Sequence, residues 1–475
     1  MPDIWSTARL SDGKKAAPFG GTDTSKGDLR SAFERDYDRM LFSTPVRRLS
    51  DKTQVFPLDR NDGVRTRLTH SHEVSNLARS IGRRLLKIDP QIFGAPEIAA
   101  EVPTILAVAG LGPALGNPPF GHQGEAAIRD WFSAAATGPE QIFGSVEAPL
   151  VSTELQKDFT NFEGNAHTLR LVARLQVHPL GCGLDLTACS LAALMKYTVP
   201  SHRSGQSDSA SRKKPGYFAS EADVVKWVRA KTGLSEGQRH PLTWLMEACD
   251  DIAYSVLDVE DAIKKRIVSA DDVFGYLSAH SEVKDTDIIL QLKDDFLKAG
   301  DGIRPSRSAE IKTTYLRTRL IGTLVTGAAD EFVKNKKAIF DYTQTKPLLS
   351  IPNPTTALCR ALKKFAASNA YSHSSVLKIE AVASKTMHKL MDYFWKAVCN
   401  REDQNDRSSK RKEAMASFVY SIVSDNYKSE FEDSEISYET TMRYRELQLI
   451  SDMAAGMTDS FAMNLCNEFE EMNCA

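Results

Sequence analysis

The sequence predicts an all-α protein. In most segments of the 475-residue chain, apolar residues recur at steps of three and four, and few segments alternate at period two. Apolar residues make up 42% and charged residues 26%, as in ordinary globular proteins. The net charge of −2 gives no overall electrostatic attraction to nucleic acid or to a membrane surface. No apolar run reaches the roughly 18–20 residues of a membrane span. We therefore expect a helical, cytoplasmic protein with a large core and no membrane partner.

The polar stretches suggest how the chain is organised. Residues 1–28 are rich in Gly, Ser and Lys without a signal-peptide core, which predicts a mobile arm. Three polar stretches, at 137–149, 200–216 and 400–413, are typical of exposed loops rather than long linkers. The interpretation is one large domain over 29–475 with a helical C-terminal extension. The short stretch 50–59, "SDKTQVFPLD", is also compatible with a small hairpin.

The cysteines indicate a reducing environment. The seven are scattered and form no CxxC pair. Cys182 and Cys189 are close enough in sequence to pair or to bind a metal, although small core residues are the simpler interpretation.

One predicted helix, over 65–85, carries an inward-facing histidine. His70 lies on the apolar stripe of Val74 and Ile81, whereas His72 is rotated away by about half a turn. Arg67 precedes His70 by one turn on the same face. A lone inward histidine is usually a satisfied core residue, but burying it beside an arginine also suits an anion or a metal.

A second helix, over 245–267, places a carboxylate on an apolar face. Asp250 shares its face with Met246 and Tyr254, so it needs a partner, and a metal is one choice. The alternative is a solvated acidic face. Glu260 and Asp261, next to two lysines, fit that alternative, and Asp250 does not.

A Pro-rich turn follows the apolar run that ends at 112. The stretch "GPALGNPPFGHQGE" delivers His122 and Glu125, and it holds Pro113 and Ala114 where polar ligands might stand. Elsewhere the chain supplies scattered donors of the kind that bind phosphate oxygens. They are Asn165, Lys196, Tyr197 and Lys214, and none of them is informative alone.

Eight motifs together carry a resemblance to a known family. They are "RSAFERDYDRMLFSTPVRRLSDKTQVF", "RTRLTHS", "GNPPFGHQGE", "NFEGNA", "LMKY", "KPGYF", "LMEACDDIAYSVLDVEDAI" and "AGMTDSFA". In this order, from about residue 29 to the C-terminus, they resemble the bacterial dGTP triphosphohydrolases, a branch of the HD-domain phosphohydrolases. The resemblance implies an HD-type helical fold.

The resemblance also implies a divalent metal, Mg²⁺ or Mn²⁺, held by His, His-Asp and Asp. His70 matches the first ligand and Asp250 the last. The His-Asp doublet should stand directly before "LGNPPFGH", where this chain has Pro113 and Ala114. Neither side chain can coordinate a metal, so we expect weak or absent metal binding.

The implied reaction is attack of water on the α-phosphorus of dGTP, releasing deoxyguanosine and triphosphate. His122 and Glu125 match a pair beside the α-phosphate, in which the histidine transfers a proton and the carboxylate orients the histidine. Arg67, Asn165, Lys196, Tyr197 and Lys214 would clamp the triphosphate, Tyr254 and Asp258 would line the sugar, and Gln54 would lie near the sugar and base. Losing several kcal/mol of transition-state stabilisation with the metal would lower turnover by orders of magnitude.

Two alternatives stay open for the function. One is a dNTP triphosphohydrolase scaffold with impaired turnover. The other is an inactive pseudoenzyme that senses nucleotide or single-stranded DNA through assembly, since the family forms homo-oligomers, often hexamers. "SRKK" (211–214) and "SSKRK" (408–412) are candidate DNA contacts, but solvated loops are favoured because no aromatic residues are interleaved with them. Pro113 and Ala114 fit a natural loss of the dyad and a deliberate change equally well. Base preference cannot be read from the sequence.

Overall fold

The protein is helical throughout its described part, which confirms the predicted all-α class. The computed structural model describes residues 3–14, 29–56, 58, 61–138, 141–145, 147–300, 302–432 and 440–474. In these ranges the regular structure consists of α-helices with short 3₁₀ and π turns, and strand-like pairing is limited to isolated bridges. The chain divides into two compact units, each built from separate stretches of sequence. Whether residues 29–475 act as one domain stays a prediction.

Unit 1 comprises Met1–Thr53, Leu111–His240 and Glu380–Ala475. Its helices are α1 (Ala32–Leu41), α2 (Thr44–Arg48), η1 (Leu49–Asp51), α5 (His122–Thr137), α6 (Thr153–Thr160), α7 (Gly164–Ala173), α8 (Ala188–Leu194), η2 (Ser201–Arg203), η3 (Ala210–Arg212), η4 (Ala219–Glu221), α9 (Ala222–Thr232), α17 (Ala414–Ser421), α18 (Asp425–Glu432), α19 (Met442–Gly456) and α20 (Asp459–Cys474).

Unit 2 comprises Gln54–Gly110 and Pro241–Ile379. Its helices are α3 (Arg67–Ile88), α10 (Pro241–Lys264), α11 (Ala270–Ala279), α12 (Asp287–Gly300), α13 (Pro305–Lys334), α14 (Lys336–Phe340), η5 (Leu348–Ser350), α15 (Pro354–Ala366) and the π turn η6 (Ala367–Tyr371). Two further helices, α4 (Pro96–Leu111) and α16 (Ser374–Cys399), run from one unit's sequence into the other's.

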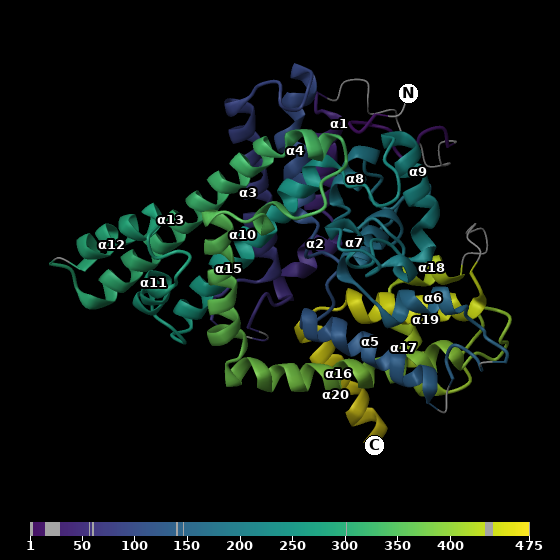
Figure 1. Ribbon diagram of the computed structural model, residues 1–475. Coiled ribbons are helices and arrows are strands. Elements are labelled where there is room, and N and C mark those ends of the chain that lie inside the picture. The colour runs from purple at the N-terminus through teal and green to yellow at the C-terminus, as the bar shows by residue number, and fades with distance from the viewer. Residues whose placement is uncertain are drawn as a thin grey trace. The chain divides into compact units, whose positions relative to one another are not determined.

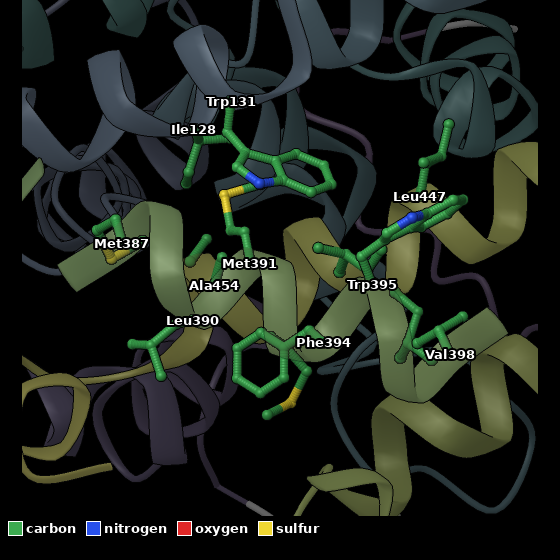
Figure 2. Packing of buried hydrophobic residues seen from close by; sticks show 14 of the residues in the cluster. Ile128, Trp131, Met387, Leu390, Met391, Phe394, Trp395, Val398, Leu447 and Ala454 are labelled. Atoms are coloured by element: carbon green, nitrogen blue, oxygen red, sulfur yellow. The ribbon is translucent and has the colours of Figure 1, made fainter. Parts of the chain in front are cut away.

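The core of unit 1 is rich in aromatic and sulfur-containing side chains. Figure 2 shows Met391 and Trp395 of α16 packed among residues that include Trp131 of α5 and Leu447 of α19. The Trp131 indole also donates a 2.7 Å hydrogen bond to Asp392, which satisfies its polar edge. This core ties the C-terminal helices to the middle of the chain, so the predicted C-terminal extension is part of unit 1.

Unit 2 is organised around α10, which packs against α3, α13 and α15. Helices α11, α12 and α13 pack on one another and lie together in Figure 1. All but five of the 24 residues of α10 are buried, and the buried residues include the carboxylates of Asp258, Glu260 and Asp261. The helix is therefore a rigid support for the side chains that it presents.

Part of the N-terminal segment is attached to unit 1. Asp3 donates its backbone amide to the carbonyl of Lys231, and Arg9 forms a 2.8 Å ion pair with the buried Asp36. Residues 1–2 and 15–28, the remainder of the predicted arm, lie outside the described residues. The predicted mobility of the arm stays a prediction.

The hairpin considered for 50–59 is wrong over its described residues. Residues Leu49–Asp51 form a 3₁₀ turn, and Pro57, Asp59 and Arg60 lie outside the described part. The physical reason lies at Thr53, whose backbone amide donates to the Asp459 side chain at 3.0 Å, so that Thr53 takes part in no more than an isolated bridge.

The interpretation of Cys182 and Cys189 as small core residues is confirmed, and the reducing environment stays a prediction. Cys182 and Cys189 are buried free thiols in unit 1. Burial raises the pKa of both thiols, which keeps them protonated and inert.

Candidate functional site

The turn after α4 carries Pro113 and Ala114. It is closed by hydrogen bonds from Leu115 to the Gly112 carbonyl (3.0 Å) and from Asn117 to the Ala114 carbonyl (3.3 Å). Ala114 is buried, and neither side chain has an atom that could bind a cation. The backbone turn is thus complete although its two expected ligands are missing.

Close packing explains the glycine that follows. A Cβ on Gly116 would lie 2.0 Å from the carbonyl oxygen of Gly164 and 2.4 Å from the amide of Thr168. The Gly116 amide donates to the Thr168 hydroxyl at 2.9 Å. The turn therefore rests directly on the start of α7.

Asp459 fixes the Pro-rich part of the turn. Its Oδ1 accepts the backbone amide of Phe120 at 2.9 Å, and its Oδ2 accepts that of Thr53. Phe120 adopts φ of 61°, a left-handed conformation that is uncommon for a bulky residue and that these contacts maintain. Lys52 adds a 2.6 Å bond from its Nζ to the Asn117 carbonyl. A side chain of the motif "AGMTDSFA" thus binds the backbone of the motif "GNPPFGH", although more than 300 residues separate them in sequence.

His122 and Glu125 lie on the first turn of α5. The His122 side chain is 77% exposed, and its Nδ1 lies 3.6 Å from Oε2 of the buried Glu125. Glu125 also accepts the Gly164 amide at 3.0 Å. Burial alone would raise the pKa of Glu125, but His122, Lys214 and the Gly164 amide together hold it below its usual value. The ionised carboxylate can therefore orient an accessible imidazole.

Glu163, which the sequence analysis did not single out, holds two of the predicted phosphate donors. Its Oε1 accepts from the side-chain amide of Asn165 at 2.7 Å, and its Oε2 pairs with Lys214 Nζ at 2.7 Å. Burial lowers the pKa of Lys214, but the Glu163 carboxylate outweighs that effect and raises it, so Lys214 is charged. The position of Glu163 inside the motif "NFEGNA", two residues before Asn165, was a usable signal.

The other two donors of unit 1 precede the loop that carries Lys214. Tyr197 is buried, and Lys196 is half-buried. The Tyr197 carbonyl lies so close to Gly216 that a Cβ there would be 2.2 Å from it. The pKa of Lys214 is sensitive to Glu125 and Tyr197, which places both residues near it. Unit 1 thus gathers Glu125, Lys214 and Tyr197 in one region.

A buried ion-pair network supports α7. Arg170 forms a bidentate pair with Asp452 of α19, with contacts of 2.7 and 2.6 Å, and it binds Glu221 at 2.9 Å. Burial raises the pKa of Glu221 to about 7 despite the arginine. The network anchors the helix whose first turn carries Asn165.

In unit 2, α3 and α10 bring His70 and Asp250 together. His70 Nε2 lies 3.4 Å from Asp250 Oδ1, and the His70 side chain is only 4% exposed. Its Nδ1 is buried without a hydrogen-bond partner among the described residues. His72 is exposed, so the predicted inward and outward faces of α3 are confirmed. Arg67 is buried at the first position of α3, one turn before His70.

The solvated acidic face predicted for the end of α10 is wrong. Glu260 and Asp261 are buried, because Arg65 reaches both of them, at 2.5 and 2.6 Å. Arg317 of α13 also binds Glu260 at 2.7 Å. Arginines that are distant in sequence neutralise these carboxylates, and helical spacing alone could not show this.

The predicted sugar-lining residues contact a tyrosine that the sequence analysis missed. Tyr371 of η6 donates a 2.6 Å hydrogen bond to Asp258, and its ring lies 5.7 Å from that of Tyr254. Burial raises the pKa of Asp258 to about 7. Asp258 Oδ1 and Gln54 Oε1 are buried without hydrogen-bond partners among the described residues. Tyr371 lies in the π turn η6 and belongs to none of the eight sequence motifs.

The predicted site residues therefore fall into two sets. Unit 1 holds His122, Glu125, Asn165, Lys196, Tyr197 and Lys214, and unit 2 holds Gln54, Arg67, His70, Asp250, Tyr254 and Asp258. Each set has internal contacts that join several of its members.

The donor set does not fit a divalent metal. Among the described residues, no group of three or more His, Cys, Asp or Glu side chains is arranged to hold one. His70 and Asp250 form a pair with each other, and Pro113 and Ala114 supply no ligand atoms. A closed metal site usually needs four ligands and a catalytic one at least three.

The all-α architecture of the described residues is consistent with an HD-type helical fold. A deoxyguanosinetriphosphate triphosphohydrolase-like protein of Listeria innocua is 33% identical over 468 residues, covering 96% of this chain and 97% of the relative. The deoxyguanosinetriphosphate triphosphohydrolase of Yersinia enterocolitica is 30% identical over 490 residues, covering 94% and 95%. The chain belongs to the deoxyguanosinetriphosphate triphosphohydrolase family. No family model matches it.

None of the helices in the described part of the chain combines the length and the apolar character that crossing a membrane requires.

Proposed function

We propose that this chain is a deoxynucleoside triphosphate triphosphohydrolase scaffold that binds dGTP or another dNTP and turns it over poorly. The observation that carries the proposal is a contrast between two groups of positions. Pro113 and Ala114 stand where two metal ligands are expected, whereas the residues predicted to bind phosphate are present. The relatives named above are triphosphohydrolases by name. The products of the reaction would be deoxyguanosine and triphosphate.

Unit 1 would supply the groups that act on the phosphates. Lys214 is a charged donor positioned by Glu163, and charge-assisted hydrogen bonds of this kind are the strong ones in phosphate recognition. His122 is exposed to solvent beside an ionised carboxylate, which suits it to hold or deliver a proton at the α-phosphate. Asn165, Lys196 and Tyr197 would share the oxygen atoms of the triphosphate.

Unit 2 holds the residues that the sequence predicts to contact the sugar and the base. The unpartnered buried oxygens of Gln54 and Asp258 are acceptors that a sugar hydroxyl or a base could satisfy. The tilted rings of Tyr254 and Tyr371, 5.7 Å apart, offer an apolar wall beside Asp258. Arg67 would contact the triphosphate. His70 and Asp250 remain as half of a metal-ligand set.

The test is triphosphate release from dGTP in Mg²⁺ or Mn²⁺. The chain is compared with the variant Pro113→His/Ala114→Asp, and the metal content of both is measured on the same preparations. We expect metal binding and a rate increase of at least about a hundredfold in the restored variant, since a bound metal supplies several kcal/mol of stabilisation. Equal inactivity of a folded, metal-loaded variant would contradict the assignment of the site.

A second candidate is a nucleotide-responsive pseudoenzyme that acts through assembly. The retained Glu163–Lys214 and His122–Glu125 pairs favour it, because binding groups survive where metal ligands do not. Thermal unfolding with millimolar dGTP should then show stabilisation without hydrolysis. Light scattering with and without dGTP or single-stranded DNA would measure the homo-oligomer, which we expect to be a hexamer. No shift in either measurement would exclude this role.

A further inference from the structure

Three arginines from separate segments of unit 1 surround one carboxylate. Arg203 ends η2, Arg212 ends η3 and Arg229 lies in α9, while Glu236 follows that helix in the loop 233–240. Arg203 Nη1 lies 3.0 Å from Glu236 Oε1, whereas Arg212 and Arg229 approach the carboxylate only to 3.9 Å. We call these four residues the arginine cluster. Two of its guanidinium groups are thus beyond hydrogen-bond distance of the carboxylate.

Backbone groups hold two of these arginines in place. Arg229 donates to the Thr198 carbonyl at 2.8 Å and lies over the Tyr217 ring, 5.7 Å from its centre. Arg212 donates to the Glu236 carbonyl at 3.2 Å. The guanidinium of Arg212 also lies against Gly237, where a Cβ would be 2.3 Å from it. The glutamate side chain is therefore not what positions these two guanidinium groups.

The cluster carries an excess of positive charge. Three guanidinium groups and one carboxylate give a net charge of +2, because 3 − 1 = 2. The Arg203 side chain is 54% exposed and that of Glu236 28%, so an incoming anion can reach them. Guanidinium groups remain charged in proteins and match the oxygens of a phosphate. One carboxylate leaves most of that binding capacity unused.

A small pocket lies beside Arg229 of the cluster. It has a volume of about 20 Å³, enough for one water-sized group, and Arg229, Ser235 and Thr198 contribute to its lining. One oxygen atom of an anion bound to the arginines would fit there.

We propose that the arginine cluster is a binding site for a phosphate group, and that Glu236 occupies the anion position when the ligand is absent. The ligand is orthophosphate or the phosphate of a small phosphorylated molecule. The site is composed of residues other than those assigned to dNTP binding, and the proposal does not depend on the proposed function. The loop that was interpreted from sequence as solvated, 200–216, supplies two of its three arginines.

The experiment is calorimetric titration of the full chain with orthophosphate and with a nucleoside monophosphate, at constant ionic strength. We expect saturable phosphate binding that becomes at least about tenfold tighter in Glu236→Gln, because a competing negative charge has been removed. Arg203→Gln should weaken binding at least about fivefold, since an exposed charged donor has been lost. Tighter binding of the monophosphate than of orthophosphate would identify a nucleotide as the ligand, and equal binding would identify phosphate itself.

Two controls separate this site from other effects. Glu282→Gln removes a carboxylate that pairs with the single arginine Arg360 at 2.6 Å, and it should leave phosphate binding unchanged. Binding should also persist in Lys214→Ala, which alters the proposed dNTP site. The proposal fails if Glu236→Gln, folded as judged by circular dichroism, binds phosphate no more tightly than the unaltered chain. It also fails if chloride at equal ionic strength displaces the signal.

Discussion

Tyr371 donates a 2.6 Å hydrogen bond to Asp258, and it does so inside the packed interior of unit 2. The bond stabilises the ionised carboxylate, but burial outweighs it and raises the pKa of Asp258 from 3.8 to about 7. The aspartate is therefore largely protonated in the folded protein at mildly acidic pH. A protonated carboxyl can donate as well as accept, which changes what it can bind.

The raised pKa makes stability depend on pH in a definite direction. Between about pH 4 and 7 the folded state holds a proton on Asp258 that the unfolded state has released, so the free energy of unfolding falls as pH rises. Asp258→Asn should remove this contribution to the pH dependence. The change in the free energy of unfolding that the substitution causes should therefore be more favourable at pH 8 than at pH 4, by roughly 1–4 kcal/mol. Urea unfolding across this range measures both.

Asp89 provides the matched control. Its pKa is lowered by a hydrogen bond from Lys336 at the protein surface, so Asp89→Asn should alter the pH dependence only slightly and in the opposite sense. An unchanged slope in Asp258→Asn would show that Asp258 titrates normally.

Glycine at 116 is required by the backbone that surrounds it. In Gly116→Ala the new methyl group would meet the Gly164 carbonyl and the Thr168 amide, and backbone atoms cannot move aside as a flexible side chain can. We expect a loss of about 1–3 kcal/mol in the free energy of unfolding. Gly275→Ala, in α11 with open space around it, should instead stabilise by about 0.5–1 kcal/mol. Chemical denaturation of both variants is the measurement, and similar effects would refute the packing argument.

Asp459 contributes to stability through two backbone amides. Asp459→Ala should cost about 2–4 kcal/mol, because the amides of Phe120 and Thr53 both lose a charged acceptor. Asp459→Asn keeps one acceptor oxygen and should cost about half as much. The order of stability, measured by thermal unfolding, should be Asp, Asn, Ala. An alanine variant as stable as the asparagine variant would mean that only one bond matters.

Lys214 should matter for nucleotide affinity and its neighbour should not. Lys214→Ala removes a charged phosphate donor, and we expect dGTP binding to weaken about tenfold or more. Lys213 is exposed, so Lys213→Ala should weaken it less than twofold. Isothermal titration with dGTP distinguishes the two. Equal losses would indicate that only the general positive charge of the loop is involved.

The helical class and the inward faces of two helices could be predicted from the sequence because they depend on local periodicity. His70 inside and His72 outside follow from the 3.6-residue repeat, and the structure agrees. The same reasoning failed at Glu260 and Asp261, whose partners Arg65 and Arg317 are far away in sequence. Periodicity gives the face of a helix but not the chemistry of what packs against it.

The candidate site was predictable to a similar extent. Motif residues such as Lys214 and Glu125 were identified, but the residues that position them were not. Glu163, Tyr371 and Asp459 act through hydrogen bonds made across long sequence separations, and their residue types are common at surfaces. The thiols Cys182 and Cys189 were placed correctly because small apolar side chains without a CxxC pattern are usually buried.

The bond between Asp459 and Phe120 has a consequence for biosynthesis. The ribosome completes the Pro-rich turn early, but the carboxylate that clamps it is added 339 residues after Phe120. Unit 1 cannot acquire its final form until α20 has emerged from the ribosome, and contacts of such high sequence separation slow folding. A nascent chain stalled before α20 should therefore remain dependent on chaperones, whatever its metal or nucleotide supply.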